Sequence, residues 1–152
     1  MRVLFVCTGN TCRSSMAQAI TMRRLKQKGV FSVKVFSAGT YTVSGLPASG
    51  SAIIAMKESG LDLEQHRSKV LDREMVKEAD LVITMTGSHS RSVLGMCPEA
   101  AGKVFTLTEY VGLKGDVMDP FGGDLEVYRR VADQLESMLG LAVDRMIAPT
   151  SH

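Results

Sequence analysis

Residues 2–15 read RVLFVCTGNTCRSS, and the class of fold can be inferred from this segment outward. Its apolar part, residues 2–6, predicts a short buried strand, and the Cys-Thr-Gly-Asn sequence that follows predicts a tight loop. From Ser14 onward apolar residues recur at helical spacing: Met16, Ala19, Ile20 and Leu25. The stretch therefore predicts a strand, a loop and a helix in succession.

Three more strand candidates follow, separated by helical segments. The short apolar runs are residues 31–37, 80–86 and 104–107, and the helical segments are residues 49–58, 72–78 and 88–96. A loop is expected next, and then a long final helix with Asp124 as its N-cap. Parallel neighbouring strands need connections of helix length, and these are right-handed. The alternation therefore predicts an α/β fold, a three-layer sandwich with helices on both faces of a parallel sheet.

Length and charge limit the class of protein. A chain of 152 residues with 45% hydrophobic and 22% charged residues is expected to form one globular domain, residues 1–152. The net charge of +2 is too small for a nucleic-acid surface, which needs clustered Lys and Arg. The densest basic stretch is interpreted as a solvated helix face, with a docking patch as the alternative: Arg23, Arg24, Lys26 and Lys28.

The three cysteines do not form the dense, even framework of a small secreted protein. No segment combines a basic start, an apolar stretch and a small-residue cleavage site, and no apolar run is long enough to span a bilayer. We therefore expect a cytoplasmic protein that is neither exported nor embedded in a membrane.

The first loop has the features of an anion cradle. Five residues separate Cys7, at the end of a strand, from Arg13, at the start of a helix. Backbone N–H groups of such a loop and of the helix N-terminus converge on one point, where Arg13 can grip two oxygens of a phosphate or other oxyanion. The same field is expected to make Cys7 a thiolate near neutral pH.

Other loop residues suit this geometry. Gly9 and Asn10 tolerate the left-handed backbone that turns successive N–H groups inward. The Ser14 hydroxyl can donate a hydrogen bond to the sulfur of Cys7. The alternative is that Cys7 is an inert buried cysteine. The arginine and the helix start at this spacing favour a phosphate-binding nucleophile.

A thiolate that displaces a leaving group from phosphorus also needs a proton donor on a mobile loop. Asp119 fits, because Pro120 restricts its backbone and Gly122 and Gly123 allow the loop to bend. Phe121 is expected to line the mouth of the pocket. The alternative is a simple Asp-Pro turn before the last helix.

These two motifs resemble those of the low-molecular-weight protein tyrosine phosphatases over essentially the whole chain. The resemblance implies a four-stranded parallel sheet, a phosphocysteine intermediate and no metal or other cofactor. It implies Cys7 as nucleophile, Arg13 as phosphate ligand and Asp119 as general acid and then base. Asn10 and Ser14 match residues that stabilise the loop, Ser37 matches a hydrogen-bond partner of the loop asparagine, and His66 matches a supporting histidine. The phosphate-binding loop then comprises, beside Cys7 and Arg13, the residues Thr8, Gly9, Asn10, Thr11, Cys12 and Ser14.

The substrate is expected to be a phosphorylated protein. Thr11 stands where tyrosine-specific members commonly carry a branched aliphatic residue, and Gly122 follows Phe121 where a second aromatic is frequent. Both features resemble the bacterial branch of the family that acts on protein phosphoarginine. A hydroxyl at Thr11 can orient a guanidinium or the attacking water, which an aliphatic side chain cannot. Phosphotyrosine remains the alternative, with Thr11 as a β-branched packing residue.

Cys12 lies in the same loop as Cys7, and a reversible disulfide between them would protect the nucleophile from irreversible oxidation. A zinc site is disfavoured, because His66, His89 and Cys97 are scattered along the chain. An arsenate reductase would need a further pair of relay cysteines, and a non-catalytic phosphate-binding module would not need both the nucleophile and the acid. The sequence therefore favours a phosphatase.

Overall fold

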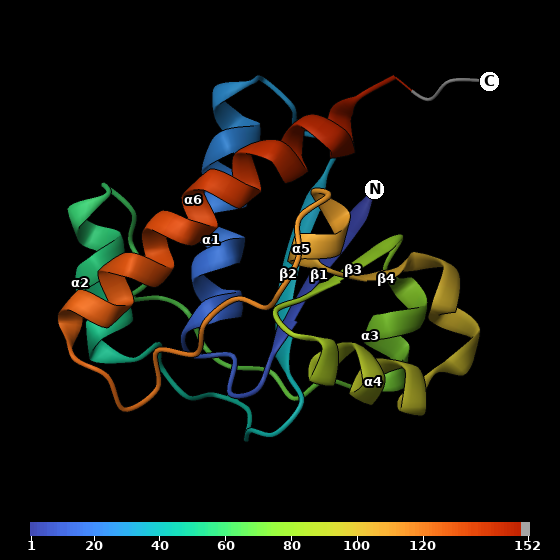
Figure 1. Ribbon diagram of the computed structural model, residues 1–152, viewed down its shortest axis with the longest axis horizontal. Helices are drawn as coiled ribbons and strands as arrows, with labels where there is room; N and C mark the ends of the chain where they lie inside the picture. The colour runs from blue at the N-terminus through green and yellow to red at the C-terminus, as the bar shows by residue number, and fades with distance from the viewer. Residues whose placement is uncertain (150–152) are drawn as a thin grey trace.

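The computed structural model describes residues 1–149 and has a parallel sheet of four strands at its centre (Figure 1). The strand order is β2-β1-β3-β4. The strands are β1 (Arg2–Cys7), β2 (Lys34–Gly39), β3 (Leu81–Thr84) and β4 (Val104–Thr106). All three neighbouring pairs are parallel, and the register places Cys7 opposite Gly39. The predicted α/β fold is confirmed.

Helices cover both faces of this sheet (Figure 1). One face carries α1 (Arg13–Gln27), α2 (Gly50–Glu58), α5 (Leu107–Tyr110) and α6 (Leu125–Ile147). The other carries α3 (Arg73–Glu78) and α4 (Gly87–Met96). Side chains of β1 alternate between the two cores, because successive residues of a strand point to opposite faces. Val3 and Phe5 belong to the core under α1 and α6, and Leu4 and Val6 to the core under α3 and α4.

Two short elements were not expected from the sequence. A 3-10 helix spans Pro98–Lys103, and α5 lies in the segment where we expected a loop. Thr106 and Glu109 explain α5, because each side chain accepts a hydrogen bond from the other residue's backbone N–H in a capping box. The Thr-x-x-Glu signal was therefore present in the sequence.

The bounds of β2 also differ from the expected residues 31–37. Pairing with β1 starts where Lys34 lies opposite Arg2 and continues to Gly39. The partner strand thus sets the limits of β2, whereas the apolar run alone does not.

The last helix follows the prediction. The side chain of Asp124 accepts a hydrogen bond from the backbone N–H of Val127 and caps α6. Eight side chains of α6 are buried at helical spacing: Tyr128, Val131, Ala132, Leu135, Met138, Leu139, Ala142 and Val143. Within residues 1–149, none of the helices is long and apolar enough to cross a membrane.

Candidate active site

The loop between β1 and α1 lies at the carboxyl edge of the sheet, where ligands of open parallel sheets bind. The helix after it has neither a side-chain cap nor an acidic residue in its first turn. The N–H groups at the start of α1 are therefore available to an anion.

Asn10 gives the loop its shape. Its φ of 58° lies in the left-handed region, as expected from the sequence, and its side chain is fully buried. The side-chain Nδ2 donates to the Oγ of Ser14 over 2.8 Å, and Oδ1 accepts from the backbone N–H of Lys69 over 2.9 Å. Because both ends of the amide are bonded, the backbone N–H of Asn10 is held 3.3 Å from the Sγ of Cys7.

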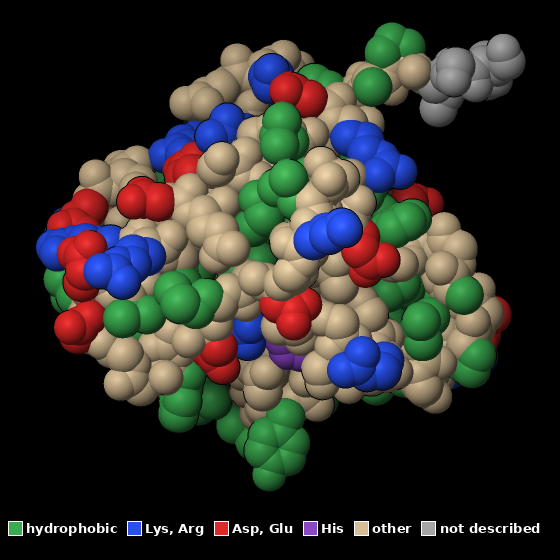
Figure 2. Space-filling model, in the orientation of Figure 1, with side chains coloured by type: hydrophobic (Ala, Val, Ile, Leu, Met, Phe, Trp, Pro, Cys, Tyr) green, Lys and Arg blue, Asp and Glu red, His purple; other side chains and the backbone are tan. Residues whose placement is uncertain are grey.

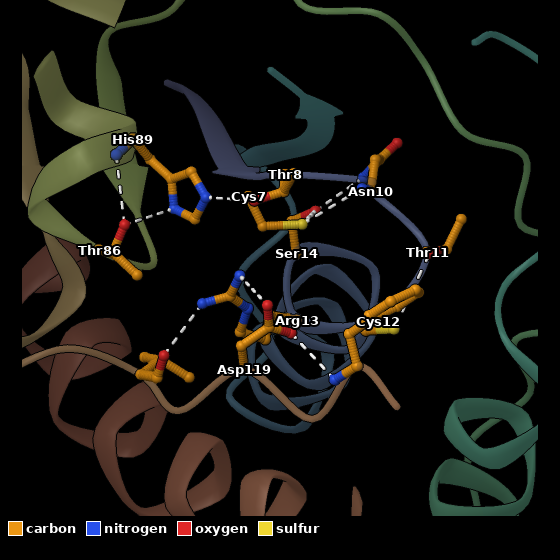
Figure 3. A network of polar contacts seen from close by, with 12 residues as sticks. Cys7, Thr8, Asn10, Thr11, Cys12, Arg13, Ser14, Thr86, His89 and Asp119 are labelled. Carbon is orange, nitrogen blue, oxygen red and sulfur yellow. Dashed lines mark hydrogen bonds and ion pairs between the residues drawn. The ribbon is translucent and has the colours of Figure 1, made fainter. Parts of the chain in front are cut away.

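The Ser14 Oγ lies 2.8 Å from the Cys7 Sγ (Figure 3). Since Ser14 accepts a hydrogen bond from Asn10, its own proton is free to point at the sulfur. The sulfur thus faces two donors, the hydroxyl of Ser14 and the backbone N–H of Asn10. Both would stabilise negative charge on the sulfur.

Opposing effects act on the pKa of the Cys7 thiol. Burial is the largest and raises this pKa, because the side chain is only 2% exposed and a charge there is poorly hydrated. The hydrogen bonds from Ser14 and Asn10, and the charge of Arg13, lower it. The hydrogen bonds and Arg13 thus favour the thiolate predicted from the sequence, and burial opposes it. The sequence indicated the donors but not the extent of burial.

Arg13 connects the loop to the acid. Its side chain is buried, and NH1 donates to the backbone carbonyl of Val117 over 3.0 Å. NH2 lies 3.6 Å from the Oδ2 of Asp119, whose side chain is 56% exposed. The other carboxylate oxygen of Asp119 accepts from the backbone N–H of Phe121, which closes an Asp-Pro turn. Asp119 therefore both closes this turn and faces the loop arginine.

A cavity of about 280 Å³ lies over the loop. Its lining is Cys7, Thr8, Gly9, Thr11, Cys12, Arg13, Tyr41, Asp119 and Phe121. The aromatic side chains of Tyr41 and Phe121 are highly exposed at 85% and 84%. Figure 2 shows hydrophobic side chains protruding at the lower edge of the molecule, below a region where acidic, basic and histidine side chains meet. The tertiary structure thus brings the two distant motifs to one pocket.

Two supporting residues differ in outcome. The Nε2 of His66 donates to the backbone carbonyl of Asn10 over 2.6 Å, and burial lowers the pKa of this imidazole. The expected hydrogen bond from Ser37 to the loop asparagine is wrong, because the Ser37 hydroxyl donates to the side-chain oxygen of Gln18 over 2.6 Å. Ser14 and the backbone of Lys69 occupy the amide of Asn10 instead.

His89 reaches the site although the sequence did not indicate it. Its Nε2 lies 2.8 Å from the Thr8 Oγ1, and its Nδ1 lies 3.0 Å from the Thr86 Oγ1 (Figure 3). The signal that could have found this pair is the position of Thr86, just after β3, because the carboxyl ends of parallel strands meet at one edge.

Cys12 is the last residue of the loop before α1, and its Sγ lies 3.5 Å from both the Ser49 Oγ and the Tyr128 hydroxyl. Cys7 and Cys12 are both free thiols. Over residues 1–149, no three His, Cys, Asp or Glu side chains are arranged to hold a metal ion.

Sequence comparison decides the family. Residues 2–146 match the family described as low molecular weight phosphotyrosine protein phosphatase. The chain belongs to this family. It is a cysteine-based phosphatase, as the sequence predicted.

The relatives of this phosphatase include proteins named as arginine phosphatases and proteins named as tyrosine phosphatases. A protein-arginine-phosphatase of Geobacillus stearothermophilus is 42% identical over 146 residues, which cover 95% of each chain. A cysteine-to-serine mutant of the YwlE arginine phosphatase, with a phosphorylated active-site serine, superposes with a TM-score of 0.92 at 39% identity, covering 96% of this chain and 95% of that one. A low molecular weight protein tyrosine phosphatase from T. tengcongensis superposes at 0.91 with 46% identity, covering 95% and 99%.

Proposed function

We propose that this phosphatase hydrolyses phosphoarginine in protein substrates through a phosphocysteine formed on Cys7. The observation that carries the proposal is a cavity whose lining combines Cys7 and Arg13 with a hydroxyl, that of Thr11, and a carboxylate, that of Asp119. The relatives named as arginine phosphatases support it.

The first step transfers the phosphoryl group to sulfur. Arg13 leaves its contacts with Val117 and Asp119 and binds two phosphoryl oxygens with its planar fork, alongside the N–H groups of the loop. The sulfur of Cys7 attacks phosphorus as the bond from phosphorus to the guanidine nitrogen breaks. Asp119 gives its proton to that nitrogen, and arginine leaves as the free side chain.

The proton of the Cys7 thiol needs a destination before the attack. A thiol facing a phosphoryl dianion holds the same number of protons as a thiolate facing a monoanion. Transfer of the thiol proton to a phosphoryl oxygen therefore prepares the nucleophile, and Ser14 and Asn10 stabilise the sulfur charge that results.

The second step returns the enzyme to its starting state. The carboxylate of Asp119, now ionised, takes a proton from a water molecule that attacks phosphorus. The bond between sulfur and phosphorus breaks, inorganic phosphate forms, and Ser14 stabilises the departing thiolate. The thiolate then takes back from the phosphate the proton that the phosphoryl group received, which restores the thiol.

Preference for arginine is assigned to the cavity wall. Asp119 carries the only carboxyl group among the described residues that line the cavity, so its oxygen is the carboxyl acceptor available there to a guanidinium N–H group. Thr11 presents a hydroxyl that can orient a guanidinium N–H group or the attacking water.

Phosphotyrosine is the second candidate substrate. Tyr41 and Phe121 are the exposed aromatic side chains at the cavity, and aromatic rings favour an aromatic leaving group. A planar guanidinium also stacks on aromatic faces, so these two residues alone do not separate the substrates.

Turnover of two peptides with the same sequence, one carrying phosphoarginine and the other phosphotyrosine, tests the proposal. We expect preference for phosphoarginine, reversal of that preference in Thr11→Ile, and its retention in Thr11→Ser, which keeps the hydroxyl. Cys7→Ser should abolish turnover while leaving phosphate binding intact. If the wild type prefers phosphotyrosine and Thr11→Ile leaves that preference unchanged, the proposal is wrong and Thr11 is a packing residue.

The proposal extends to the setting of the enzyme. We propose that the chain acts as one phosphatase domain in the cytoplasm, on phosphorylated proteins, without nucleic acid as a partner. The net charge of +2 and the absence of a spanning helix in residues 1–149 support this setting.

A further inference from the structure

Three side chains form a hydrogen-bonded chain that runs to the cavity from α4, on the face of the sheet that carries α3 and α4. Thr86 caps the N-terminus of α4, His89 lies in the first turn of that helix, and Thr8 lines the cavity. Figure 3 shows the imidazole of His89 between the two threonines. His89 is only 5% exposed, so solvent does not compete for its ring nitrogens. The roles of donor and acceptor along this chain are therefore decided by the protein.

The capping bond fixes those roles. The Thr86 Oγ1 already accepts the backbone N–H of His89 over 3.2 Å. Among residues 1–149, the Nδ1 of His89 is the only group positioned to accept the hydroxyl proton of Thr86, at 3.0 Å. The arrangement that uses every proton has Thr86 donating to Nδ1, so the ring proton resides on Nε2. Nε2 then donates to the Thr8 Oγ1 over 2.8 Å.

Thr8 consequently accepts one hydrogen bond and keeps its own proton. Within the described part of the chain, its hydroxyl contacts no partner other than His89. We propose that His89 is a positioning residue that holds the Thr8 hydroxyl as a donor to a bound phosphoryl oxygen. This inference rests on the proposed function of the loop as the phosphoryl site.

The electrostatic surroundings keep the imidazole neutral, as the chain of donors requires. Burial and then the charge of Arg13 lower the pKa of His89 to about 4, against smaller opposite effects of Asp116 and Asp119. A neutral ring with one proton can accept from Thr86 and donate to Thr8 at the same time, which an imidazolium cannot.

Four variants test the proposal: Thr8→Val, His89→Leu, His89→Gln and the double variant Thr8→Val/His89→Leu. Removal of the Thr8 hydroxyl should raise the Kd for inorganic phosphate, measured by calorimetry, by about tenfold, the loss typical of one hydrogen bond to a charged group. His89→Leu should cost a similar factor, and the double variant no more than Thr8→Val alone. His89→Gln should restore binding, since its amide can donate from nearly the position of Nε2.

The nitrogen-15 chemical shifts of the His89 ring give a second readout, because they distinguish a proton on Nε2 from one on Nδ1. A proton on Nδ1 would overturn the inference. So would a result in which His89→Leu raises the Kd for phosphate by the same factor in Thr8→Val as in the wild type. If His89→Leu does not fold, Thr8→Val, His89→Gln and the ring shifts still decide the question. Phosphate binding needs no turnover, so a failure to hydrolyse either phosphopeptide would reject the proposed function separately.

Discussion

Gly39 packs so closely against the backbone of Thr8 that a Cβ on Gly39 would lie 2.5 Å from the Thr8 carbonyl oxygen. The chain after it stays on the loop, because the backbone N–H groups of Thr40 and Tyr41 donate to the carbonyls of Cys7 and Thr8. The end of β2 thus acts as a template for the phosphate loop.

Gly39→Ala should therefore distort the loop and lower both stability and kcat/KM. Overpacking costs about 1–3 kcal/mol, and the displaced N–H groups of the loop should reduce turnover by at least about tenfold. Urea unfolding and steady-state kinetics measure the two effects. Gly95→Ala is the control, since an added Cβ there meets nothing. Equal stability and equal kcat/KM of the two variants would show that Gly39 does not shape the phosphate loop.

Ser14→Ala should move the pH profile of Cys7 alkylation by iodoacetamide to higher pH. The substitution removes a hydrogen bond that lowers the pKa of this thiol, while the burial that raises the pKa is unchanged. Turnover should fall as well, because the leaving thiolate loses a donor. Ser92→Ala, on an exposed part of α4, provides the control. An unchanged alkylation profile in Ser14→Ala would mean that the hydroxyl does not act on the sulfur.

Acid should destabilise the protein through His89. The folded pKa of about 4 lies below the ordinary value of 6.5, so between these values the unfolded chain binds the extra proton. Stability is therefore lost as pH falls from 6.5 through 4. Urea unfolding across this range should show a smaller acid loss in His89→Gln than in the wild type. Some loss should persist, since burial also lowers the pKa of His66. Parallel pH curves for the two proteins would contradict the assignment.

Leu135→Ala should destabilise the protein by about 2–5 kcal/mol, because this residue of α6 is fully buried in the core that also contains residues of α1. Leu141→Ala on the same helix should change stability by less than about 0.5 kcal/mol, since Leu141 is largely exposed. Chemical unfolding measures both. Similar values for the pair would show that α6 does not depend on its buried face.

Peroxide should inactivate the enzyme reversibly through Cys12. Oxidation of Cys7 gives a sulfenic acid, and the Cys12 thiol condenses with it to a disulfide with loss of water. Dithiothreitol should restore activity to the wild type and to Cys97→Ser, whose cysteine lies in the core on the other face of the sheet. Cys12→Ser should recover less, because its Cys7 oxidises further. Full recovery of Cys12→Ser would eliminate the protective role.

Local sequence determined much of the fold. A continuous apolar run located β1, which is buried on both faces, and hydrophobic periodicity located α1 and α6, because burial of one helix face imposes a regular spacing. The anion-binding loop could also be predicted from the sequence. Cys7, Asn10 and Arg13 lie within one short segment, whose geometry follows from the end of a strand and the start of a helix. A left-handed Asn10 was foreseeable from its conformational tolerance.

The contacts of distant residues with the loop depend on the tertiary structure. It paired Asn10 with Lys69 and Ser37 with Gln18, set the limits of β2 by pairing with β1, and brought Asp119 to Arg13. It also determined the burial that raises the pKa of Cys7, and it placed His89 against Thr8. The physical reason is common to all of these. Hydrogen bonds and desolvation depend on distances of a few ångströms between residues far apart in sequence, which local spacing does not specify.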